Sequence, residues 1–468
     1  MAIENTHYGA ETIERMLSGC RSIYFIGIGG INMSSLALIS KARGYRVGGS
    51  DRAQSALIDR LRGEGITVYP SHMAEQIEDF DAVVYTVAIP GNNPEYVRAQ
   101  ERGIPCISRA DYLGYLMTGY RNRVGVCGMH GKSTCTSMCA LTFLRAGVNP
   151  TVSSGAELAA MGGAYHIGGE EHFLFEACEY MDSFLDFNPT VAVVLNIEMD
   201  HVDYFKSMEQ IRKSFANFMA LTGKDGYAVL NADDPEVMEA AKTYEGHRLT
   251  FGINNTNADL RAVGLCEKKG CWSFEIELHG KQLCHVSLRV PGAHQVYNAL
   301  ATAGAAWLCG LTAEQIADGL SHFGGAARRM EYKGKCNGAL LYDDYGHHPT
   351  EVRTTLKGAK AMTAGMGHLW CVFQSHTYSR TAALLSEFAT AFADADRVVI
   401  LPIYSARETD TLGMSPSVMA DAIGNGALPT ESFAEAARIL REELREEDVA
   451  IIMGAGDSYR MFDLLLDR

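Results

Sequence analysis

The stretch Val124–Thr134 reads VGVCGMHGKST and decides the fold of the middle of the chain. A short apolar run ends in a glycine-rich bend, and Gly-Lys-Ser then opens a helical pattern. Backbone N–H groups of such a bend and of the helix N-terminus point at anionic oxygens, so the pattern is typical of a phosphate-binding loop. The loop is shorter than G-x-x-x-x-G-K-[ST], because its glycines are Gly125 and Gly128. We expect Lys132 to reach the outer phosphates and Ser133 to ligate Mg²⁺, although a plain glycine turn before a helix is the alternative.

Length and composition limit the classes of protein to consider. The 468 residues suggest about three domains, and 47% hydrophobic with 21% charged residues is ordinary for a chain that buries large cores. The 41 basic and 56 acidic residues give a net charge of −15, which disfavours nucleic acid and anionic membranes as partners. The twelve cysteines include no C-x-x-C pair. Since no apolar run approaches about 18 residues and no signal peptide opens the chain, we expect a cytoplasmic protein with reduced thiols.

Strands alternate with helical patterns along the whole chain, which predicts parallel sheets. The junctions at Arg121-Asn122 and at Gly324–Ala327 suggest domains at 1–120, 121–325 and 326–468. Gly264–Val290 differs, because its alternating residues and two glycine turns indicate antiparallel hairpins. The other expected elements are strands at Ile23–Ile26, Arg46–Gly49, Asp81–Ile89, Phe173–Ala177, Val191–Ile197, Tyr227–Leu230, Leu340–Asp343, Leu369–Phe373, Arg397–Leu401 and Val449–Met453, and helices at Ser34–Arg43 and Gln295–Cys309.

A second glycine loop, Gly27–Asn32, follows the first expected strand. It nearly fits the dinucleotide fingerprint G-x-G-x-x-G, with Asn32 in place of the third glycine. Asp51 lies about 20 residues further on, where an acid that binds ribose is expected. The pattern indicates a nucleotide diphosphate at a helix N-terminus, or only a tight strand–helix turn. It does not distinguish NAD from another diphosphate.

Two acidic clusters end strands of the sheet that should carry the phosphate loop. Glu176 and Glu179 follow Phe173–Ala177, and Asn196–Asp203 follows Val191–Ile197. Both therefore bring carboxylates near the triphosphate, and Mg²⁺ prefers oxygen ligands and substrate phosphates. His201 is a less usual Mg²⁺ ligand and remains ambiguous on chemistry alone. For either acid, a helix N-cap or a solvated loop is the alternative.

Polar side chains also follow strands in the last third of the chain. Asp343–Pro349 reads DDYGHHP and Gln374–Arg380 reads QSHTYSR. Arg380 and His376 could hold a carboxylate, because Arg forms bidentate pairs with that group. The alternative for the first segment is a surface turn, capped by an Asp before Pro349, that starts a helix.

In this order the motifs resemble those of the Mur ligases of bacterial cell-wall synthesis, and within that family the branch that adds L-alanine. The resemblance covers the whole chain and is specific as a set. Its matching segments are Phe25–Gly30 with Met33 and Ser34, Gly128–Thr134, Asn196 and Ile197 with Asp200, His201 and Asp203, Pro291 and Gly292 with His294 and Asn298, Arg329, Asp343–Pro349, and His376 with Tyr378 and Arg380.

The resemblance implies an α/β fold of three domains. These would be a Rossmann-like UDP-binding domain, a P-loop ATPase-like central domain with a parallel sheet plus a small antiparallel sheet, and a Rossmann-like C-terminal domain that presents the amino acid. The positions it assigns to the UDP-sugar are Gly27, Gly29, Gly30, Asn32, Met33, Ser34 and Asp51. Those it assigns to ATP are Gly128, His130, Gly131, Lys132, Ser133, Thr134, His294, Asn298 and Arg329.

The same resemblance assigns the remaining roles. Ser133, Glu176 and His201 would be ligands of two Mg²⁺ ions. Tyr345, His348, His376 and Arg380 would bind the amino acid, and Lys132, His201, His347 and Arg380 would be the catalytic residues.

The implied reaction uses ATP to join L-alanine to the lactyl carboxylate of UDP-N-acetylmuramate through an acyl phosphate. It is a step of peptidoglycan precursor synthesis, which cell-wall biogenesis, cell shape and cell division require. The implied cofactors are ATP and Mg²⁺, and the partners are UDP-N-acetylmuramate and L-alanine, with no nucleic acid and no membrane. The oligomeric state stays open.

Several positions depart from the family pattern and keep alternatives open. Cys178 and Met181 replace two carboxylates near the metal, which motivates a catalytically dead nucleotide-binding partner as a second hypothesis. Thr377 replaces an Arg that could hold the amino acid's carboxylate, and a ligase that attaches a preformed tripeptide to the same sugar is a third. Smaller changes are Asn32 and Ser133, for Gly and Thr, and Gln295 for Asn. An NAD-dependent enzyme is disfavoured because it leaves the phosphate loop unexplained.

Overall fold

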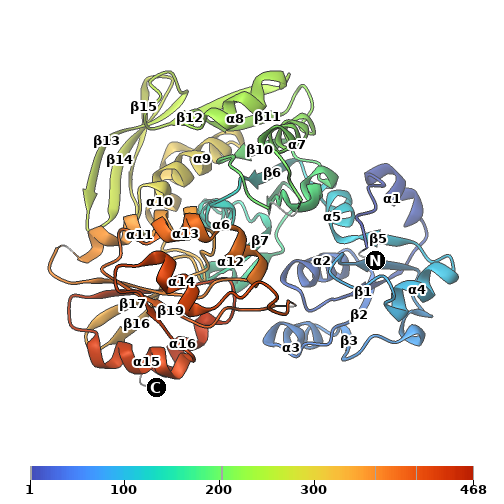
Figure 1. The fold of residues 1–468 in the computed structure, drawn as a ribbon. Helices are drawn as coiled ribbons and strands as arrows, with labels where there is room; N and C mark the ends of the chain where they lie inside the picture. The colour runs from blue at the N-terminus through green and yellow to red at the C-terminus, as the bar shows by residue number, and fades with distance from the viewer. Residues whose placement is uncertain (1–2, 202–203, 364, 407, 467–468) are drawn as a thin grey trace. The chain divides into compact units, whose positions relative to one another are not determined.

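The computed structural model describes residues 3–201, 204–363, 365–406 and 408–466 (Figure 1). The chain divides into two compact units, Met1–Leu260 with Ala301–Ile316 and Arg261–Leu300 with Ala317–Arg468. Asp203, which belongs to one of the sequence motifs, lies outside the described residues. Among the described helices, none combines the length and the apolar character needed to cross a bilayer.

The first unit begins with a five-stranded sheet in the order β3-β2-β1-β4-β5, whose strands all run parallel. The predicted strand Asp81–Ile89 is shorter in the structure, because Ile89 N–H donates to Thr86 O at 3.2 Å and closes a turn. The strands are β1 (Ser22–Ile26), β2 (Arg46–Ser50), β3 (Thr67–Tyr69), β4 (Ala82–Tyr85) and β5 (Cys106–Ser108). The helices are α1 (Ala10–Met16), α2 (Ile31–Ala42), α3 (Ala56–Gly63), α4 (Pro94–Glu101) and α5 (Arg109–Met117).

The rest of this unit is built on the phosphate loop's strand. That strand, β6, lies in the middle of the order β12-β11-β10-β6-β9-β7-β8, and its pairs with β9 and β10 are parallel. The edge pair β7–β8 is antiparallel and was not predicted from the sequence. The strands are β6 (Asn122–Cys127), β7 (Thr151–Leu158), β8 (Gly163–His166), β9 (His172–Glu176), β10 (Val191–Val194), β11 (Tyr227–Asn231) and β12 (His247–Gly252). The helices are α6 (Lys132–Arg145), α7 (Met208–Ala220) and α8 (Pro235–Ala240).

One continuous apolar core runs through the first unit. It includes Phe25 of β1, Phe175 of β9 and Phe218 of α7, all with no exposed surface. Because strands buried on both faces are apolar at nearly every position, they read as unbroken hydrophobic runs in the sequence. That is why these strands were predictable.

The second unit contains the expected hairpins and a six-stranded sheet. Strands β13 (Leu260–Lys268), β14 (Cys271–Leu278) and β15 (Lys281–Ser287) follow one another, and β14 pairs antiparallel with β15. The other sheet has the order β16-β17-β21-β18-β19-β20 and is parallel except for β16. Its strands are β16 (Glu331–Cys336), β17 (Ala339–Asp344), β18 (Leu369–Phe373), β19 (Arg397–Ile400), β20 (Leu428–Pro429) and β21 (Val449–Met453). The helices outside the first unit, in whole or in part, are α9 (His294–Leu308), α10 (Ala313–Ser321), α11 (Pro349–Lys360), α12 (Tyr378–Ala383), α13 (Leu385–Ala391), α14 (Pro416–Ile423), α15 (Phe433–Glu443) and α16 (Met461–Leu465).

Strand β18 shows how this sheet is covered on both faces. Leu369, Cys371 and Phe373 belong to one apolar core, whereas Trp370 and Val372 belong to another. Successive side chains of a strand point to opposite faces, so each core takes every second residue. The carboxyl ends of β17, β18 and β21 therefore lie at one edge between two helical layers, and that edge carries the polar segments predicted from the sequence.

Candidate functional site

The phosphate loop joins β6 to α6 and depends on two glycines. Gly128 has φ +145° and Gly131, the N-cap of α6, has φ +84°. Both values lie in the region that side chains disfavour. A Cβ on Gly128 would also lie 3.0 Å from Leu195 Cβ, tighter than ordinary packing. Glycine therefore suits both positions, as the pattern predicted, and at Gly128 a side chain would also crowd Leu195.

Asn196 holds the loop from the neighbouring strand. Its Oδ1 accepts a hydrogen bond from His130 N at 2.8 Å, and its Nδ2 donates to His130 O at 2.9 Å. The predicted strand Val191–Ile197 is therefore too long, since β10 ends at Val194 and the next residues serve the loop. This clamp fixes the backbone whose N–H groups would face a phosphate.

Lys132 opens α6 and is largely buried, with 13% of its side chain exposed. Its Nζ donates to Gly128 O at 2.7 Å, to Met129 O at 3.1 Å and to Glu179 Oε1 at 3.0 Å. Burial by itself would lower the pKa of Lys132, but the Glu179 carboxylate outweighs it and the pKa lies above its ordinary value. Burial would likewise raise the pKa of Glu179, yet Lys132 and His201 hold it below 4.5. The two side chains thus keep each other charged.

Glu179 also reaches His201, so one carboxylate bridges two predicted catalytic residues. His201 Nε2 lies 3.0 Å from Glu179 Oε1, and its ring packs on Tyr180 with 4.9 Å between centroids. Glu179 has no exposed side-chain surface. It was absent from the candidate site residues, although its place in an acidic cluster after a strand was the signal that could have included it.

Glu176 stands at the end of β9, where a metal ligand was predicted. Its Oε2 accepts a hydrogen bond from Gly155 N at 3.0 Å, and its charge contributes to the raised pKa of Lys132. Asp182, the residue after the altered position Met181, accepts a hydrogen bond from Tyr204 Oη at 2.6 Å. Asp182 therefore holds the packing of this segment.

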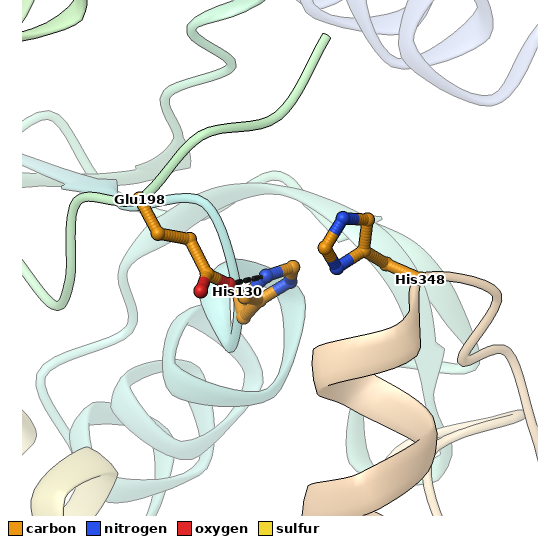
Figure 2. Close-up of side chains that lie close together, drawn as sticks. All are labelled: His130, Glu198 and His348. Atoms are coloured by element: carbon orange, nitrogen blue, oxygen red, sulfur yellow. Dashed lines mark ion pairs between the residues drawn. The ribbon is translucent and has the colours of Figure 1, made fainter. Parts of the chain in front are cut away.

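The remaining loop residues lie around the same turn. His130 forms an ion pair with Glu198, which Figure 2 marks with a dashed line. Ser133 and Thr134 are buried in the first turn of α6. The first unit therefore brings together His130, Lys132, Ser133, Glu176 and His201, as the sequence predicted, and adds Glu179 and Asn196.

The first glycine loop follows β1 in the same unit. Gly27, with φ +81°, and Ile28 donate from their N–H groups to Ser50 O at 2.8 and 3.1 Å. Gly29 N–H donates to Asp51 Oδ2 at 2.9 Å. Gly30 is the N-cap of α2, and no side chain caps that helix end. The predicted residues Asn32, Met33 and Ser34 form its first turn, so the arrangement suits an anion at a helix N-terminus.

In the second unit, Tyr345 and His347 follow β17. The ring of Tyr345 lies 5.0 Å from the guanidinium carbons of both Arg328 and Arg329. Its centroid lies 5.6 Å from that of His347. Burial lowers the pKa of His347 to about 4, with Glu351 acting in the opposite direction and Arg380 in the same one. His347 is therefore uncharged at neutral pH.

The helix after this segment is capped by His348, so the expectation of an Asp cap is wrong. His348 Nδ1 accepts from Thr350 N at 3.3 Å, and Glu351 Oε2 accepts from His348 N at 3.1 Å, which completes a capping box. Asp344 instead accepts from Met330 N at 2.9 Å and Gly346 N at 2.8 Å. Burial raises the pKa of Asp344 to about 6.

The segment after β18 lies beside the same edge. His376 stacks on Tyr404 with 5.6 Å between centroids, and its centroid is 6.0 Å from that of His347. Burial, and then the charge of Arg380, lowers the pKa of His376. Thr377 has φ +61° and caps α12 by accepting from Arg380 N at 3.4 Å. Tyr345, His347, His376 and Arg380 are thus neighbours within the second unit.

The predicted adenine-side residues begin α9. Gln295 Nε2 lies 3.0 Å from His294 Nε2, and Asn298 Nδ2 donates to Gln295 Oε1 at 3.0 Å. Burial lowers the pKa of His294 to about 4. Gln295, noted only as a departure from the family pattern, therefore links the two predicted residues.

Comparisons with known proteins identify the family of the chain. Family models match residues 22–121 as "Mur ligase family, catalytic domain", 126–306 as "Mur ligase middle domain" and 328–456 as "Mur ligase, glutamate ligase domain". The chain is 41% identical to the UDP-N-acetylmuramate–L-alanine ligase of Clostridium novyi over 450 residues, which is 96% of this chain and 97% of that one.

Solved structures show the same arrangement of elements. The UDP-N-acetylmuramate–alanine ligase of Thermotoga maritima superposes with a TM-score of 0.78 and 27% identity, covering 94% of this chain and 98% of that one. A murein peptide ligase from Psychrobacter arcticus shares the fold, with a TM-score of 0.71 and 22% identity over 95% of this chain and 98% of that one. From its three matched domains and its full-length similarity, the chain belongs to the Mur ligase family.

Proposed function

We propose that this chain is an ATP-dependent ligase that joins L-alanine to the lactyl carboxylate of UDP-N-acetylmuramate in the cytoplasm, as a step of peptidoglycan precursor synthesis. The observation that carries the proposal is Lys132, whose Nζ is 2.7 Å from Gly128 O beside a glycine loop of fixed shape. A buried ammonium at the first turn of a helix suits the outer phosphates of ATP. The 41% identity to an L-alanine ligase over nearly the whole chain supports the choice of amino acid.

Each part of the chain receives a task in this proposal. Residues 1–120 bind the UDP of the sugar through the loop Gly27–Asn32, and residues 121–325 bind ATP. Residues 326–468 present the amino acid. These limits are supported by family-model matches that begin or end near them, at 121, 126, 306 and 328.

Magnesium fits the residues after β6 and β9. Ser133, Glu176 and His201 would hold the ions, and hydroxyl and carboxylate oxygens are the donors that Mg²⁺ prefers. Glu176 Oε2 accepts one backbone N–H, while its Oε1 has no hydrogen-bond partner among the described residues and stays available. The metal would supply positive charge to the transferring phosphoryl group.

The proposed ligation has two steps, and the positive charges around the phosphates assist the first. A carboxylate is a poor acyl donor, so its oxygen first attacks the γ-phosphorus of ATP and forms an acyl phosphate and ADP. Lys132 neutralises charge on the phosphates during this step. The neutral amine of alanine then attacks the acyl carbon, and the tetrahedral oxyanion collapses to an amide and phosphate. His347, uncharged with a pKa of about 4, can accept a hydrogen bond from the amine and does not repel its ammonium precursor.

Recognition of the amino acid falls to the second unit. Arg380 supplies a positive charge that lowers the pKa of both His347 and His376, so it lies close to both rings. A guanidinium in that place can bind the carboxylate of alanine. Tyr345 and His348 complete this set in the proposal.

The test is ADP release from purified protein, ATP and Mg²⁺, with one reactant omitted at a time. We expect release only when UDP-N-acetylmuramate and L-alanine are both present, with glycine and L-serine as weaker amines. If only a preformed tripeptide supports release, the protein is the recycling ligase instead. If no combination consumes ATP, the proposal is wrong and a non-catalytic nucleotide-binding role takes its place.

A further inference from the structure

Three residues at and near the predicted metal ligand His201 have left-handed backbone conformations. Met181 and Asp182 both have φ +54°, which kinks the segment Tyr180–Asp186, and His201 has φ +49°. Residues with a side chain disfavour this region, so such conformations persist only where neighbouring groups hold them in place. The reaction steps described above assign no task to the groups that do so here.

Asp182 ties this kinked segment to two other parts of the first unit. Its Oδ2 accepts a hydrogen bond from Tyr204 Oη at 2.6 Å, and its Oδ1 accepts one from Ser214 Oγ on α7. Burial, and then the hydrogen bond to Asp182, raises the pKa of Tyr204 to about 12, so this hydroxyl is a donor at neutral pH. The carboxylate therefore fixes where Tyr204 lies relative to the kink.

Tyr204 in turn holds the backbone of His201. The N–H groups of Tyr204 and Phe205 donate to His201 O at 2.8 and 2.9 Å. The ring of Tyr180 packs against the rings of His201 and Tyr204, at centroid distances of 4.9 and 6.3 Å. Asp182, Tyr204 and Tyr180, which we call the brace, therefore hold His201 at both its backbone and its ring.

The orientation of the ring decides which nitrogen His201 offers to a metal ion. Its Nε2 lies 3.0 Å from Oε1 of Glu179, which is ionised beside Lys132. A carboxylate only accepts hydrogen bonds, so Nε2 carries the hydrogen. Among the described residues, none forms a hydrogen bond with Nδ1, and 21% of the side chain is exposed. A histidine whose other nitrogen donates to a carboxylate is the usual arrangement of a metal ligand.

We propose that Asp182 and Tyr204 are positioning residues for the metal site: they fix the backbone of His201, and Tyr180 fixes its ring, so that Nδ1 is offered to the cation. This role depends on the proposed function, because it requires His201 to be a ligand of Mg²⁺. Asp182 follows the altered position Met181, and its carboxylate serves the metal site through Tyr204 and His201 rather than as a ligand. The brace explains how a segment that lacks carboxylates at positions 178 and 181 still supports a metal ion.

Manganese binding tests the brace, because Mn²⁺ takes the oxygen ligands that Mg²⁺ takes and is detected by electron paramagnetic resonance. The full chain is titrated with Mn²⁺ in the presence of ADP. His201→Ala should raise the Kd for Mn²⁺ about tenfold or more, and Tyr204→Phe, which removes only the hydroxyl that contacts Asp182, about tenfold. When residue 201 is already alanine, Tyr204→Phe should change the Kd by less than about twofold. Losses that multiply independently would overturn the proposal.

Further variants separate positioning from folding. Asp182→Gly removes the carboxylate but suits φ +54°, so the Kd for Mn²⁺ should rise as in Tyr204→Phe, even if the latter folds poorly. Tyr244→Phe is the matched control in the same unit. It removes a hydroxyl that lies 2.7 Å from Thr222 Oγ1 and donates to Gly226 O, and it should leave the Kd unchanged whatever its effect on the Tm. An unchanged Kd in either folded brace variant, or an equal rise in the control, would overturn the positioning role.

Failure of this role and failure of the ligase assignment give different results. Mn²⁺ binding is measured with ADP alone, so coupling between Tyr204 and His201 would support the brace even in a protein that shows no turnover. Turnover together with a Kd for Mn²⁺ that neither His201→Ala nor Tyr204→Phe changes would leave the ligase assignment standing and overturn the brace. A wild-type chain that binds no Mn²⁺ in the presence of ADP would overturn it as well.

Discussion

Lys132 and Glu179 stabilise the folded chain only while both are charged. The pKa of Lys132 is raised in the folded state, so its contribution is complete below its unfolded pKa of 10.5 and is lost as pH rises through the higher folded value. The pKa of Glu179 is lowered, so its contribution is complete above 4.5 and is lost as pH falls through the lower folded value. Between about pH 4.5 and 10.5 both groups are charged in the folded chain, so the pair is intact.

Replacing Lys132 tests its role with the phosphates. Lys132→Ala should lower kcat for ADP release by about 10²- to 10³-fold, because the variant loses a preorganised positive charge at the transferring group. Lys224→Ala, which removes an exposed lysine 3.3 Å from Glu245, should stay within about twofold of the wild type. Full turnover by Lys132→Ala would show that the loop does not bind the reacting phosphates.

His294 predicts a pH dependence of stability. Its folded pKa is about 4 because of burial, against 6.5 unfolded. Below pH 6.5 the His294 imidazole is protonated in the unfolded chain but stays neutral in the folded chain. The free energy of unfolding therefore falls as the pH drops from 6.5 to about 4.

His294→Gln should remove that share of the acid sensitivity, about 1 kcal/mol between pH 7.5 and pH 5 after screening by solvent. Denaturant unfolding at the two pH values measures it. His247→Gln, at an exposed site, is the control. An unchanged acid sensitivity in His294→Gln would mean that this imidazole is protonated as readily in the folded chain as in the unfolded one.

At the scale of elements, the start of α11 joins stability to the candidate site. Glu351 Oε2 accepts from His347 N at 2.9 Å and from His348 N at 3.1 Å, so one carboxylate both caps the helix and sets the backbone of two predicted site residues. Loss of a helix cap costs typically about 1 kcal/mol. Here that loss would also release the loop that carries His347.

Two cap variants separate these effects. Glu351→Ala should lower stability by about 1 kcal/mol and raise KM for L-alanine several-fold. Ser207→Ala removes the cap of α7, where Ser207 Oγ accepts from Gln210 N at 3.2 Å, and should cost a similar free energy without changing KM. Thermal melts and initial rates give both quantities. Equal KM values in the two variants would contradict the positioning role of Glu351.

Elements were predicted best where local pattern and burial agree. The strands Leu369–Phe373 and Val449–Met453 have the predicted limits, because their residues are apolar on both faces. Errors lie at ends where tertiary partners take over from the ladder. β10 stops at Val194 since Asn196 turns to the phosphate loop, and β7–β8 was missed because its sequence is rich in Ser, Gly and Ala.

At the scale of the whole molecule, the stabilisation of the fold by a bound ligand shows whether the first glycine loop binds UDP or NAD. A ligand at 100 times its Kd adds about 2.7 kcal/mol to the free energy of unfolding. UDP at that level should raise the Tm by about 2–4 °C, whereas NAD at the same concentration should leave it unchanged. Differential scanning fluorimetry with both compounds measures this. A rise with NAD alone would favour a dinucleotide enzyme.

The sequence by itself determined the α/β class, the phosphate loop and the family, because these depend on local patterns: glycine where φ is positive, apolar runs in buried strands, and polar groups at strand ends. It also placed Lys132, Glu176 and His201 after strands of one sheet, and the structure showed that these strands are neighbours. The tertiary structure alone decided which charges meet. Glu179 bridges Lys132 and His201, and Glu351 rather than an Asp completes the cap of α11. Some of these pairs join residues that are distant in the sequence, and in others one of several nearby acids forms the contact. Burial and hydrogen-bond geometry decide which residues pair, and no local sequence pattern encodes either of them.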